Sequence, residues 1–285
     1  MDLILEFIIA GVFLGGIYAL MAVPMSVVWL TTDVIDVSTG AYAVTAGMIA
    51  AMLGLPLGAV VGILAAAGLG LIVGTTFVGF HALRPQKDAI LIVLATFGFL
   101  IVIESALLTV AGSDSRFLPR IEGSWKLGSG VIPYQGAFNL AVSLILMASL
   151  AVLLKYTPLG LQMRACAISD RAAGLVGIAV RRTQLFTFVV GATTAGVAGV
   201  LAVMTVGLAY FSTFAFTTIA FSAAVVLGRK GPAAAFAGSM LLGVVEAISQ
   251  AYLPSGWAAA VPSALIVIVL ASGRMPSAAF TGLRP

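Results

Sequence analysis

The sequence predicts an all-α polytopic membrane protein, a bundle of about eight or nine transmembrane segments, some of them broken or re-entrant. Of the 285 residues, 61% are hydrophobic and only 8% are charged. Soluble globular domains are about 45–50% apolar and about 25% charged, so this chain has too few charges to cover a water-soluble core. Several apolar runs reach the roughly 20 residues that a helix needs to cross a bilayer, and none shows the alternation of a barrel strand.

Nine apolar runs are candidate spans, because a helix satisfies its backbone hydrogen bonds internally, as the hydrocarbon core of a membrane requires. They cover residues 5–30, 41–55, 57–80, 89–111, 136–154, 183–205, 208–228, 233–252 and 257–273. The second run is short and contains glycine, so we expect a broken or re-entrant segment there. We expect residues 1–285 to form a single transmembrane domain, with residues 155–182 as a loop within it.

Lysine and arginine residues between these runs predict the orientation. If all nine runs cross, eleven of the fourteen basic residues lie on one side: Arg84, Lys87, Lys155, Arg164, Arg171, Arg181, Arg182, Arg229, Lys230, Arg274 and Arg284. The other three are Arg116, Arg120 and Lys126. Because basic loops stay in the cytoplasm, we expect the loop 155–182 and the C-terminus there. An external N-terminus follows only if all nine runs cross.

The composition argues against several classes of site. The single cysteine, Cys166, excludes an intrachain disulfide and a cysteine-based metal site. The single histidine, His81, argues against a histidine-rich metal cluster or a Ser-His-Asp triad. No Walker-type glycine loop with its lysine occurs. We therefore expect no catalytic residues, no metal site, no cofactor on this chain and no nucleic-acid partner, and an energy source in a separate ATPase or an ion gradient.

The loop 155–182 has the strongest local pattern. Pro158 suits the first turn of a helix, and apolar residues follow at helical spacing: Leu161, Ala165, Ile168, Ala172 and Leu175. Asp170 can cap or start a second short helix that runs towards Gly177. A short amphipathic element of this kind can lie in a groove on a partner or rest on lipid headgroups. The pattern alone leaves both open.

Four blocks of sequence resemble the branched-chain amino acid ABC importer permeases. They contain Gly16, Tyr18, Ala19 and Leu20; then Thr157, Gly160, Arg164, Ala165, Ala172, Leu175, Gly177 and Ile178; then Thr187, Phe188, Ala195, Gly196, Gly199 and Leu201; and finally Phe221, Gly231, Pro232, Gly238, Gly243 and Glu246. The blocks follow the family's order and cover most of the chain. The sequence departs from the family at residues 36–40, where the family's Asn-Phe-Ala-His-Gly is Asp-Val-Ser-Thr-Gly.

The resemblance implies a permease subunit of an ATP-binding cassette importer for branched-chain or related amino acids, a multi-pass protein of the bacterial cytoplasmic (inner) membrane. It implies a second homologous permease, two ATPase subunits that bind ATP and Mg, and an extracytoplasmic binding protein. It also implies that the loop 155–182 couples the permease to the ATPases, through Gly160, Arg164, Ala165, Asp170, Ala172, Gly174 and Gly177. We expect Arg164 to pair with an acidic group of the ATPase or with a helix C-terminus.

Polar residues inside apolar runs are candidates for the transport path, because polar and ionisable groups are costly at membrane depth. These candidates are Tyr18, Ser26, Asp36, Ser38, Thr39 and Glu246. Glu104 lies in no motif, so we expect it to pair with a serine or threonine. A row of small residues, Gly191, Ala195 and Gly199 with Gly196 beside it, predicts a tightly packed helix.

Other functions remain open at this point. The same importer class could carry urea, amides, aromatic acids or sugars. A gradient-driven secondary transporter could instead use Asp36, Glu104 or Glu246 to carry protons. An intramembrane serine protease is disfavoured, because His81 lies at a span end beside Arg84.

Overall fold

The computed structural model describes residues 2–83, 89–127, 130–226, 231–254 and 260–271. Within them, six helices are long and apolar enough to cross a membrane. These are α1 (Asp2–Thr32), α3 (Leu57–Leu83), α4 (Ala89–Ala111), α5 (Tyr134–Tyr156), α8 (Val180–Thr205) and α10 (Pro232–Tyr252). Three apolar helices are shorter, namely α2 (Thr39–Leu53), α9 (Ser212–Val226) and α12 (Val261–Ala271). The predicted all-α polytopic membrane fold is confirmed.

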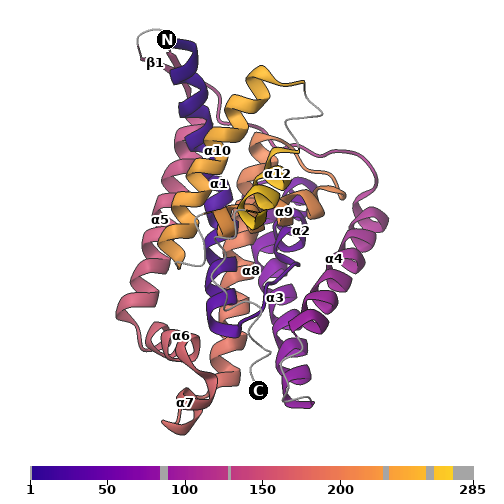
Figure 1. The fold of residues 1–285 in the computed structure, drawn as a ribbon. Helices are drawn as coiled ribbons and strands as arrows, with labels where there is room; N and C mark the ends of the chain where they lie inside the picture. The colour runs from indigo at the N-terminus through magenta and orange to yellow at the C-terminus, as the bar shows by residue number, and fades with distance from the viewer. Residues whose placement is uncertain (1, 84–88, 128–129, 227–230, 255–259, 272–285) are drawn as a thin grey trace.

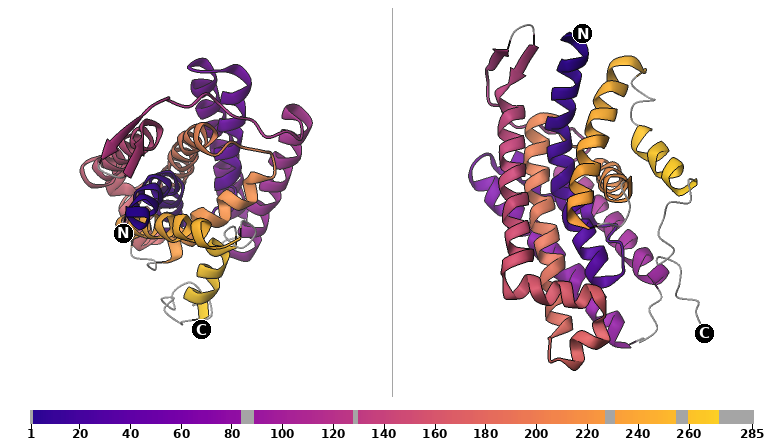
Figure 2. Two further views of the ribbon diagram at one scale, coloured as in Figure 1. Left: turned by 90° about the horizontal axis from the view of Figure 1, so that it is seen from above. Right: turned by 60° about the vertical axis from the view of Figure 1, so that its left-hand side comes forward.

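The two ends of the helix bundle carry different elements (Figure 1). The start of α1 and the hairpin of β1 (Ser124–Leu127) and β2 (Gly130–Pro133) lie at one end, which we call the hairpin end. The short helices α6 (Pro158–Ile168) and α7 (Asp170–Leu175) lie at the other, the α6–α7 end. Figure 2 shows α1, α5 and α10 running together on one flank, with α4 on the far side.

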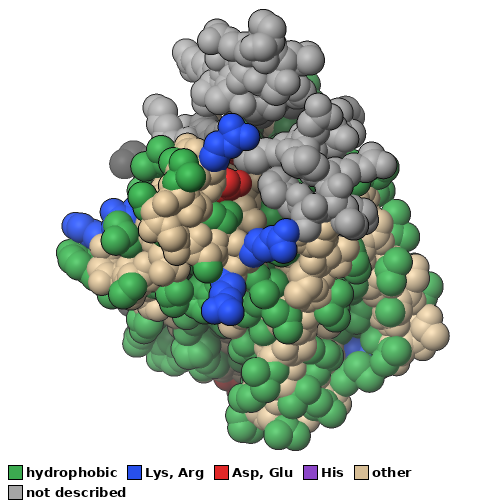
Figure 3. Space-filling model, turned by 90° about the horizontal axis from the view of Figure 1, so that it is seen from below, with side chains coloured by type: hydrophobic (Ala, Val, Ile, Leu, Met, Phe, Trp, Pro, Cys, Tyr) green, Lys and Arg blue, Asp and Glu red, His purple; other side chains and the backbone are tan. Residues whose placement is uncertain are grey.

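The charges follow this division of the bundle. Arg164 and Arg171 lie on α6 and α7, and the neighbouring helix ends supply Lys155, Arg181 and Arg182. Figure 3 shows lysine and arginine side chains distributed over this face. Arg116 and Arg120 belong to the loop that leads to the hairpin end. Lys126 lies in β1, and the six remaining basic residues lie outside the described residues: Arg84, Lys87, Arg229, Lys230, Arg274 and Arg284.

Helix α8 lies at the centre of the bundle, packed against α1, α2 and α3. Its small residues make this possible. A Cβ on Gly196 would lie 2.8 Å from the Cβ of Ala66 in α3, and a Cβ on Gly199 would overlap the backbone of Ala43 in α2. Gly191 faces Val28 of α1, and Ala195 is fully buried. The row therefore lies close to three neighbouring helices, α1, α2 and α3.

The short helices α2 and α9 have 15 residues each. At 1.5 Å per residue each is about 22 Å long, less than the roughly 30 Å of a bilayer's hydrocarbon core. The sequence predicted a short segment at 41–55, and α2 agrees with it. For the run 208–228 the structure describes a helix from Ser212 to Val226, so the helix begins four residues later than predicted. Both short helices lie inside the bundle and pack against each other.

Candidate functional site

Residues 36–40 cover the end of the connection between α1 and α2 and the first two residues of α2, and they form a compact polar turn. Both carboxylate oxygens of Asp36 accept hydrogen bonds, Oδ1 from the Ser38 amide at 2.9 Å and Oδ2 from the Tyr42 hydroxyl at 3.1 Å. The Thr39 hydroxyl donates to the Asp36 carbonyl at 2.9 Å. Asp36, Ser38 and Thr39 are all buried. An Asp that accepts from the amide two residues ahead is a recurrent turn-former, which explains why an acidic residue starts this segment.

Helix α4 contacts this turn through polar groups. The Ser38 hydroxyl donates to the Thr96 carbonyl at 2.9 Å, and the Val37 amide donates to the Thr96 hydroxyl at 3.3 Å. Further along α4, the Thr213 hydroxyl of α9 donates to the Glu104 carboxylate. The predicted pairing of Glu104 with a serine or threonine is therefore confirmed. The buried apolar side chains of α4, among them Leu100, Ile103 and Leu107, pack in the hydrophobic core, so apolar and polar contacts together attach this helix.

Thr217 of α9 completes the arrangement. Its hydroxyl accepts a hydrogen bond from the Gly40 amide at 3.0 Å and donates to the Val37 carbonyl at 2.9 Å. A Cβ on Gly40 would overlap Thr213 and Thr217, so only glycine fits there. We call residues 36–40 with Thr96, Glu104, Thr213 and Thr217 the polar seam. Thr96, Thr213 and Thr217 were not among the predicted site residues, although Thr213 and Thr217 are spaced to share one face of a helix.

A second polar group joins α1 to α10. The Tyr18 hydroxyl donates to Oε2 of Glu246 at 2.9 Å, and Nε2 of Gln250 donates to Oε1 at 3.2 Å. The six predicted path residues thus fall into two groups, Tyr18 with Glu246 and Asp36 with Ser38 and Thr39. Ser26 is buried on α1, and no hydrogen bond among the described residues joins it to either group.

A cavity of about 500 Å³ lies beside the Tyr18–Glu246 pair at the hairpin end. Phe13 and Ile17 of α1 form an apolar wall, and Gln250 of α10 lies on its lining. Gln135 and Asn139 of α5 also line it and are linked by a hydrogen bond of 2.9 Å. Ligand pockets are usually about 300–1,000 Å³, so this cavity is large enough for a small molecule.

Helices α6 and α7 form a well-capped pair. Thr157 caps α6 by accepting from the Gly160 amide at 3.1 Å, and Pro158 is the first helical residue, as predicted. Ser169 caps α7 by accepting from the Ala172 amide at 3.2 Å. Asp170 was predicted to cap or start this helix. It starts α7 but does not cap it, because its backbone is already helical and Ser169 is the extended residue before it.

The glycines of this pair have different roles. A Cβ on Gly160 would overlap the backbone of Leu153 and Leu154, so α6 packs directly on the end of α5. Gly177 ends the pair with φ +85°, a conformation that favours glycine. Gly174 has open space around it, so a side chain added there would meet no other atom of the described chain.

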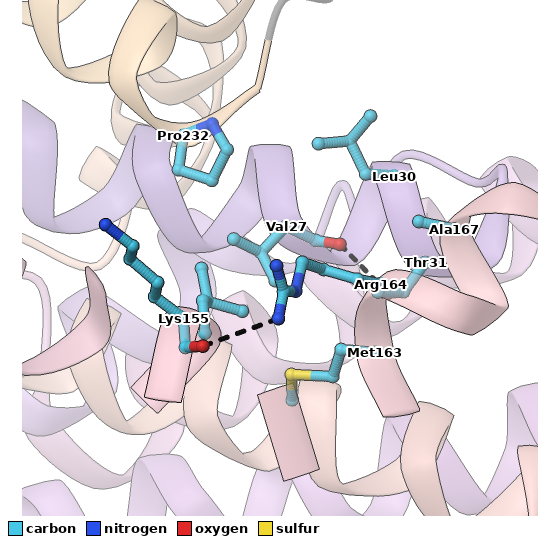
Figure 4. A pocket seen from close by; sticks show the side chains of 9 residues that line it. Val27, Leu30, Thr31, Lys155, Met163, Arg164, Ala167 and Pro232 are labelled. Carbon is cyan, nitrogen blue, oxygen red and sulfur yellow. Dashed lines mark hydrogen bonds between the residues drawn. The ribbon is translucent and has the colours of Figure 1, made fainter. Parts of the chain in front are cut away.

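Polar contacts connect α6 and α7 to the long helices. The Arg164 guanidinium donates through Nη2 to the Lys155 carbonyl at 3.4 Å, in the last turn of α5 (Figure 4). A helix C-terminus was one of the two partners expected for Arg164. Nε2 of Gln184 in α8 donates to Oδ2 of Asp170 at 3.3 Å. Cys166 lies on the buried side of α6, and burial, with the nearby Asp170 charge, raises the pKa of its thiol.

The apolar stripe predicted for this region faces away from the chain. Leu161 is 61% exposed, Ile168 87% and Leu175 85%. Of the predicted coupling residues, Ala172 is also exposed and Ala165 is half-buried. The pair therefore has an anchored side that contacts α5 and α8 and an open apolar side.

The comparisons with known proteins agree with this architecture. Residues 7–270 match the model of the family described as "Branched-chain amino acid transport system / permease component". The chain belongs to this family. The family resemblance seen in the sequence is therefore confirmed, and the chain is a multi-pass membrane protein. The four blocks of this family permease map to α1, to α6 and α7, to α8, and to α9 and α10.

Relatives of this family permease are similar over almost their whole length. The high-affinity branched-chain amino acid transport system permease protein LivH of Escherichia coli (strain K12) is 30% identical over 283 residues, which cover 91% of this chain and 90% of the relative. BraD, the corresponding permease protein of Pseudomonas aeruginosa, is 27% identical over 93% of this chain and 92% of its own. LivH of Salmonella typhimurium (strain LT2) is 30% identical over 279 residues.

A solved structure shares the fold. PsaBC from Streptococcus pneumoniae in complex with Fab matches with a TM-score of 0.53 and covers 99% of this chain and 95% of the matched chain. The two chains are only 13% identical, so the likeness concerns the fold alone.

Proposed function

We propose that this chain is the permease subunit of an ABC importer and forms the path for branched-chain or related amino acids. Family membership and the names of its relatives support this proposal. Two ATPase subunits, which bind ATP and Mg, supply the energy, and an extracytoplasmic binding protein delivers the substrate to this chain and a second homologous permease. The chain itself performs no covalent chemistry and binds no cofactor.

The observation that carries the proposal is the pair α6 and α7, which is rigidly attached on one side and open on the other. The exposed apolar side chains of Ile168 and Leu175 suit a cleft on a partner, because burying them there removes apolar surface from water. The basic side chains of this end support a cytoplasmic location for it, on the side where the ATPases act, and we propose the same side for the C-terminus.

A displacement of α6 and α7 can be transmitted to the transmembrane helices through a few direct contacts. Gly160 seats α6 on the end of α5, and the hydrogen bond between Gln184 and Asp170 ties α7 to α8. Helix α8 in turn packs closely on α1, α2 and α3. Tightly packed elements move as rigid bodies rather than deform, so displacement of α6 and α7 becomes displacement of α5 and α8.

We assign the path to the two polar groups. The polar seam contains Asp36, Ser38 and Thr39, and the other group is Tyr18 with Glu246, which lies beside the cavity at the hairpin end. Ser26 lies on the same helix as Tyr18, nearer the α6–α7 end. Buried polar groups at membrane depth need protein or water partners, and both groups can exchange their present partners for a substrate.

The coupling role is tested with Ile168→Ser and Leu175→Ser in the assembled transporter. We expect ATP-driven uptake to fall roughly tenfold while the amount of protein in the membrane stays normal, since a few buried apolar residues dominate such interfaces. Leu253→Ser is the matched control, because Leu253 is 42% exposed at the end of α10, at the opposite end of the bundle, and does not line the cavity there. Normal uptake in both variants, or equal loss in the control, would contradict the coupling assignment.

The source of energy is tested separately in proteoliposomes that contain the complete transporter. We expect uptake to require ATP and to be unaffected by collapse of the proton gradient. An Asp36→Asn variant should keep the wild-type dependence of uptake on pH. Uptake driven by a proton gradient without ATP would exclude the importer and favour a secondary transporter.

A further inference from the structure

A second cavity, of about 200 Å³, lies at the α6–α7 end where four helices meet (Figure 4). Val27 of α1, Leu154 of α5, Met163 of α6 and Pro232 of α10 all line it. Helix α6, which is proposed to couple the chain to the ATPases together with α7, thus shares this cavity with the long helices that it is proposed to move.

The floor of this cavity is apolar. Val27 is 5% exposed and Met163 is 1% exposed, so both are fixed in the packed interior. The one polar side chain of the floor, Thr31, donates its hydroxyl to the Val27 carbonyl at 2.9 Å within its own helix (Figure 4). A water molecule needs about two to four polar partners, so the floor favours hydrocarbon over water.

The rim of the cavity is cationic. Lys155 and Arg164 both line it and both are exposed. Arg164 donates to the Lys155 carbonyl at 3.4 Å, and Nζ of Lys155 lies 5.2 Å from the centre of the Tyr156 ring. Neither contact involves a carboxylate, so neither neutralises the two positive charges. The cavity therefore combines a hydrocarbon floor with a rim that attracts an anion.

The position of the cavity identifies the ligand that fits both parts. Helix α1 ends at Thr32, α5 ends at Tyr156 and α10 begins at Pro232, so the cavity lies where three long helices leave the apolar layer. Tyr156 is 71% exposed there, as is common for tyrosine at a membrane surface. Basic pockets between transmembrane helices at this level suit the headgroups of anionic lipids.

We propose that this cavity binds an anionic phospholipid, with the phosphate held by Lys155 and Arg164 and part of an acyl chain on the floor formed by Val27 and Met163. A lipid in this place contacts α1, α5, α6 and α10 together and braces α6 against the bundle. This goes beyond the proposed function, because it makes the membrane's lipid composition a regulator of the coupling pair.

The test is native mass spectrometry of the full-length chain, purified in detergent with its co-purifying subunits and supplied with phosphatidylglycerol or phosphatidylcholine. We expect wild-type protein to retain phosphatidylglycerol in preference to phosphatidylcholine. The double variant Lys155→Gln with Arg164→Gln should lose about tenfold in phosphatidylglycerol retention, because each basic residue near the headgroup contributes to the attraction. Retention should persist in Lys155→Arg with Arg164→Lys, which keeps both charges.

Two further variants distinguish specific lipid binding in the cavity from general attraction by the positive charge of this end. Arg171→Gln with Arg181→Gln removes the same charge from the same end, but neither residue lines the cavity, so retention should stay at the wild-type level. Ala167→Phe keeps the charges and fills the cavity from its lining, so retention should fall. Equal loss in both charge-removing variants, normal retention in Ala167→Phe, or full competition by inorganic phosphate would each overturn the proposal. Transport is not measured, so failure here leaves the proposed function intact.

Discussion

Hydrogen bonds from threonine hydroxyls hold the turn between α1 and α2 in place, and the Thr217 hydroxyl makes two of them. Replacing Thr217 with valine keeps the shape but leaves the Gly40 amide and the Val37 carbonyl without this partner. We expect Thr217→Val to lower the free energy of unfolding by about 1–3 kcal/mol, the usual cost of a buried unsatisfied group. Thermal unfolding of the purified protein measures this.

The neighbouring residue provides the control for this prediction. The Thr218 hydroxyl donates to the Phe214 carbonyl of its own helix, and Thr218 is only half-buried. Thr218→Val should therefore change the unfolding temperature little. Equal destabilisation by the two variants would mean that the polar seam contributes no more than a helix-surface hydroxyl.

Two glycines of α6 and α7 give a second prediction, since alanine should change the stability of the protein in opposite directions at the two positions. Gly160→Ala places a Cβ against the backbone of Leu153 and should destabilise the protein by about 1–3 kcal/mol, as overpacking does. Gly174→Ala meets open space within α7 and should stabilise it by up to about 1 kcal/mol through helix propensity. Unfolding temperatures in detergent test both. A stable Gly160→Ala protein would refute the tight seat of α6 on α5.

At the residue scale, the sequence predicted which polar groups matter better than it predicted their partners. Glu104 was expected to find a serine or threonine because a lone carboxylate at membrane depth is costly, and Thr213 supplies the bond. That threonine lies 109 residues away in the chain, and no local pattern connects the two. The same holds for Tyr18 and Glu246, which are 228 residues apart.

Among the helices, α8 is the one whose small residues are most tightly enclosed. We expect Gly199→Ala to reduce the amount of folded protein in the membrane several-fold, because the added methyl group overlaps the backbone of Ala43. Gly98→Ala in α4 is the matched control, since nothing lies within 4 Å of that position. Fluorescence-detected size-exclusion chromatography of both variants measures the folded fraction. Equal amounts of the two would argue against the close contact of α8 with α2.

Element boundaries were predictable where the determinants are local. Thr157 and Pro158 start α6 as expected, because a threonine cap followed by proline acts through neighbouring backbone groups. The start of α9 was not predictable, because hydropathy alone extends the run back to residue 208. In the structure, Ser212 and Thr213 begin the helix while Leu208 pairs with Arg116 of a distant loop. That contact depends on tertiary structure.

For the molecule as a whole, the two ends of the bundle should face opposite sides of the membrane. We expect Ile121→Cys and Leu175→Cys, each in a Cys166→Ser background, to react with a membrane-impermeant maleimide from opposite sides, since both positions are exposed. Intact cells and inside-out vesicles should give reciprocal labelling. Labelling of both cysteines from the same side would refute the orientation derived from the basic residues.

The separation of the two ends could be read from the sequence because charge and hydropathy determine it one segment at a time. The open apolar side of α6 and α7 was also visible as a stripe, but the stripe left open whether lipid or protein covers it. The cavities were not predictable, since each forms where residues of several distant segments meet.

The burial of α2 by a helix much later in the chain also has a consequence for how the chain is made. Helix α2 ends at Leu53, and 126 residues, positions 54–179, precede α8, the central helix that buries it. At about 5–20 residues per second, a ribosome needs roughly 6–25 s to reach α8. Among the helices completed before α8, α3 packs most extensively against α2, and Gly58 and Gly62 bring the two helices into backbone contact at Ala50 and Ala46. We therefore expect α2 to pair with α3 during synthesis, before α8 and α9 are made.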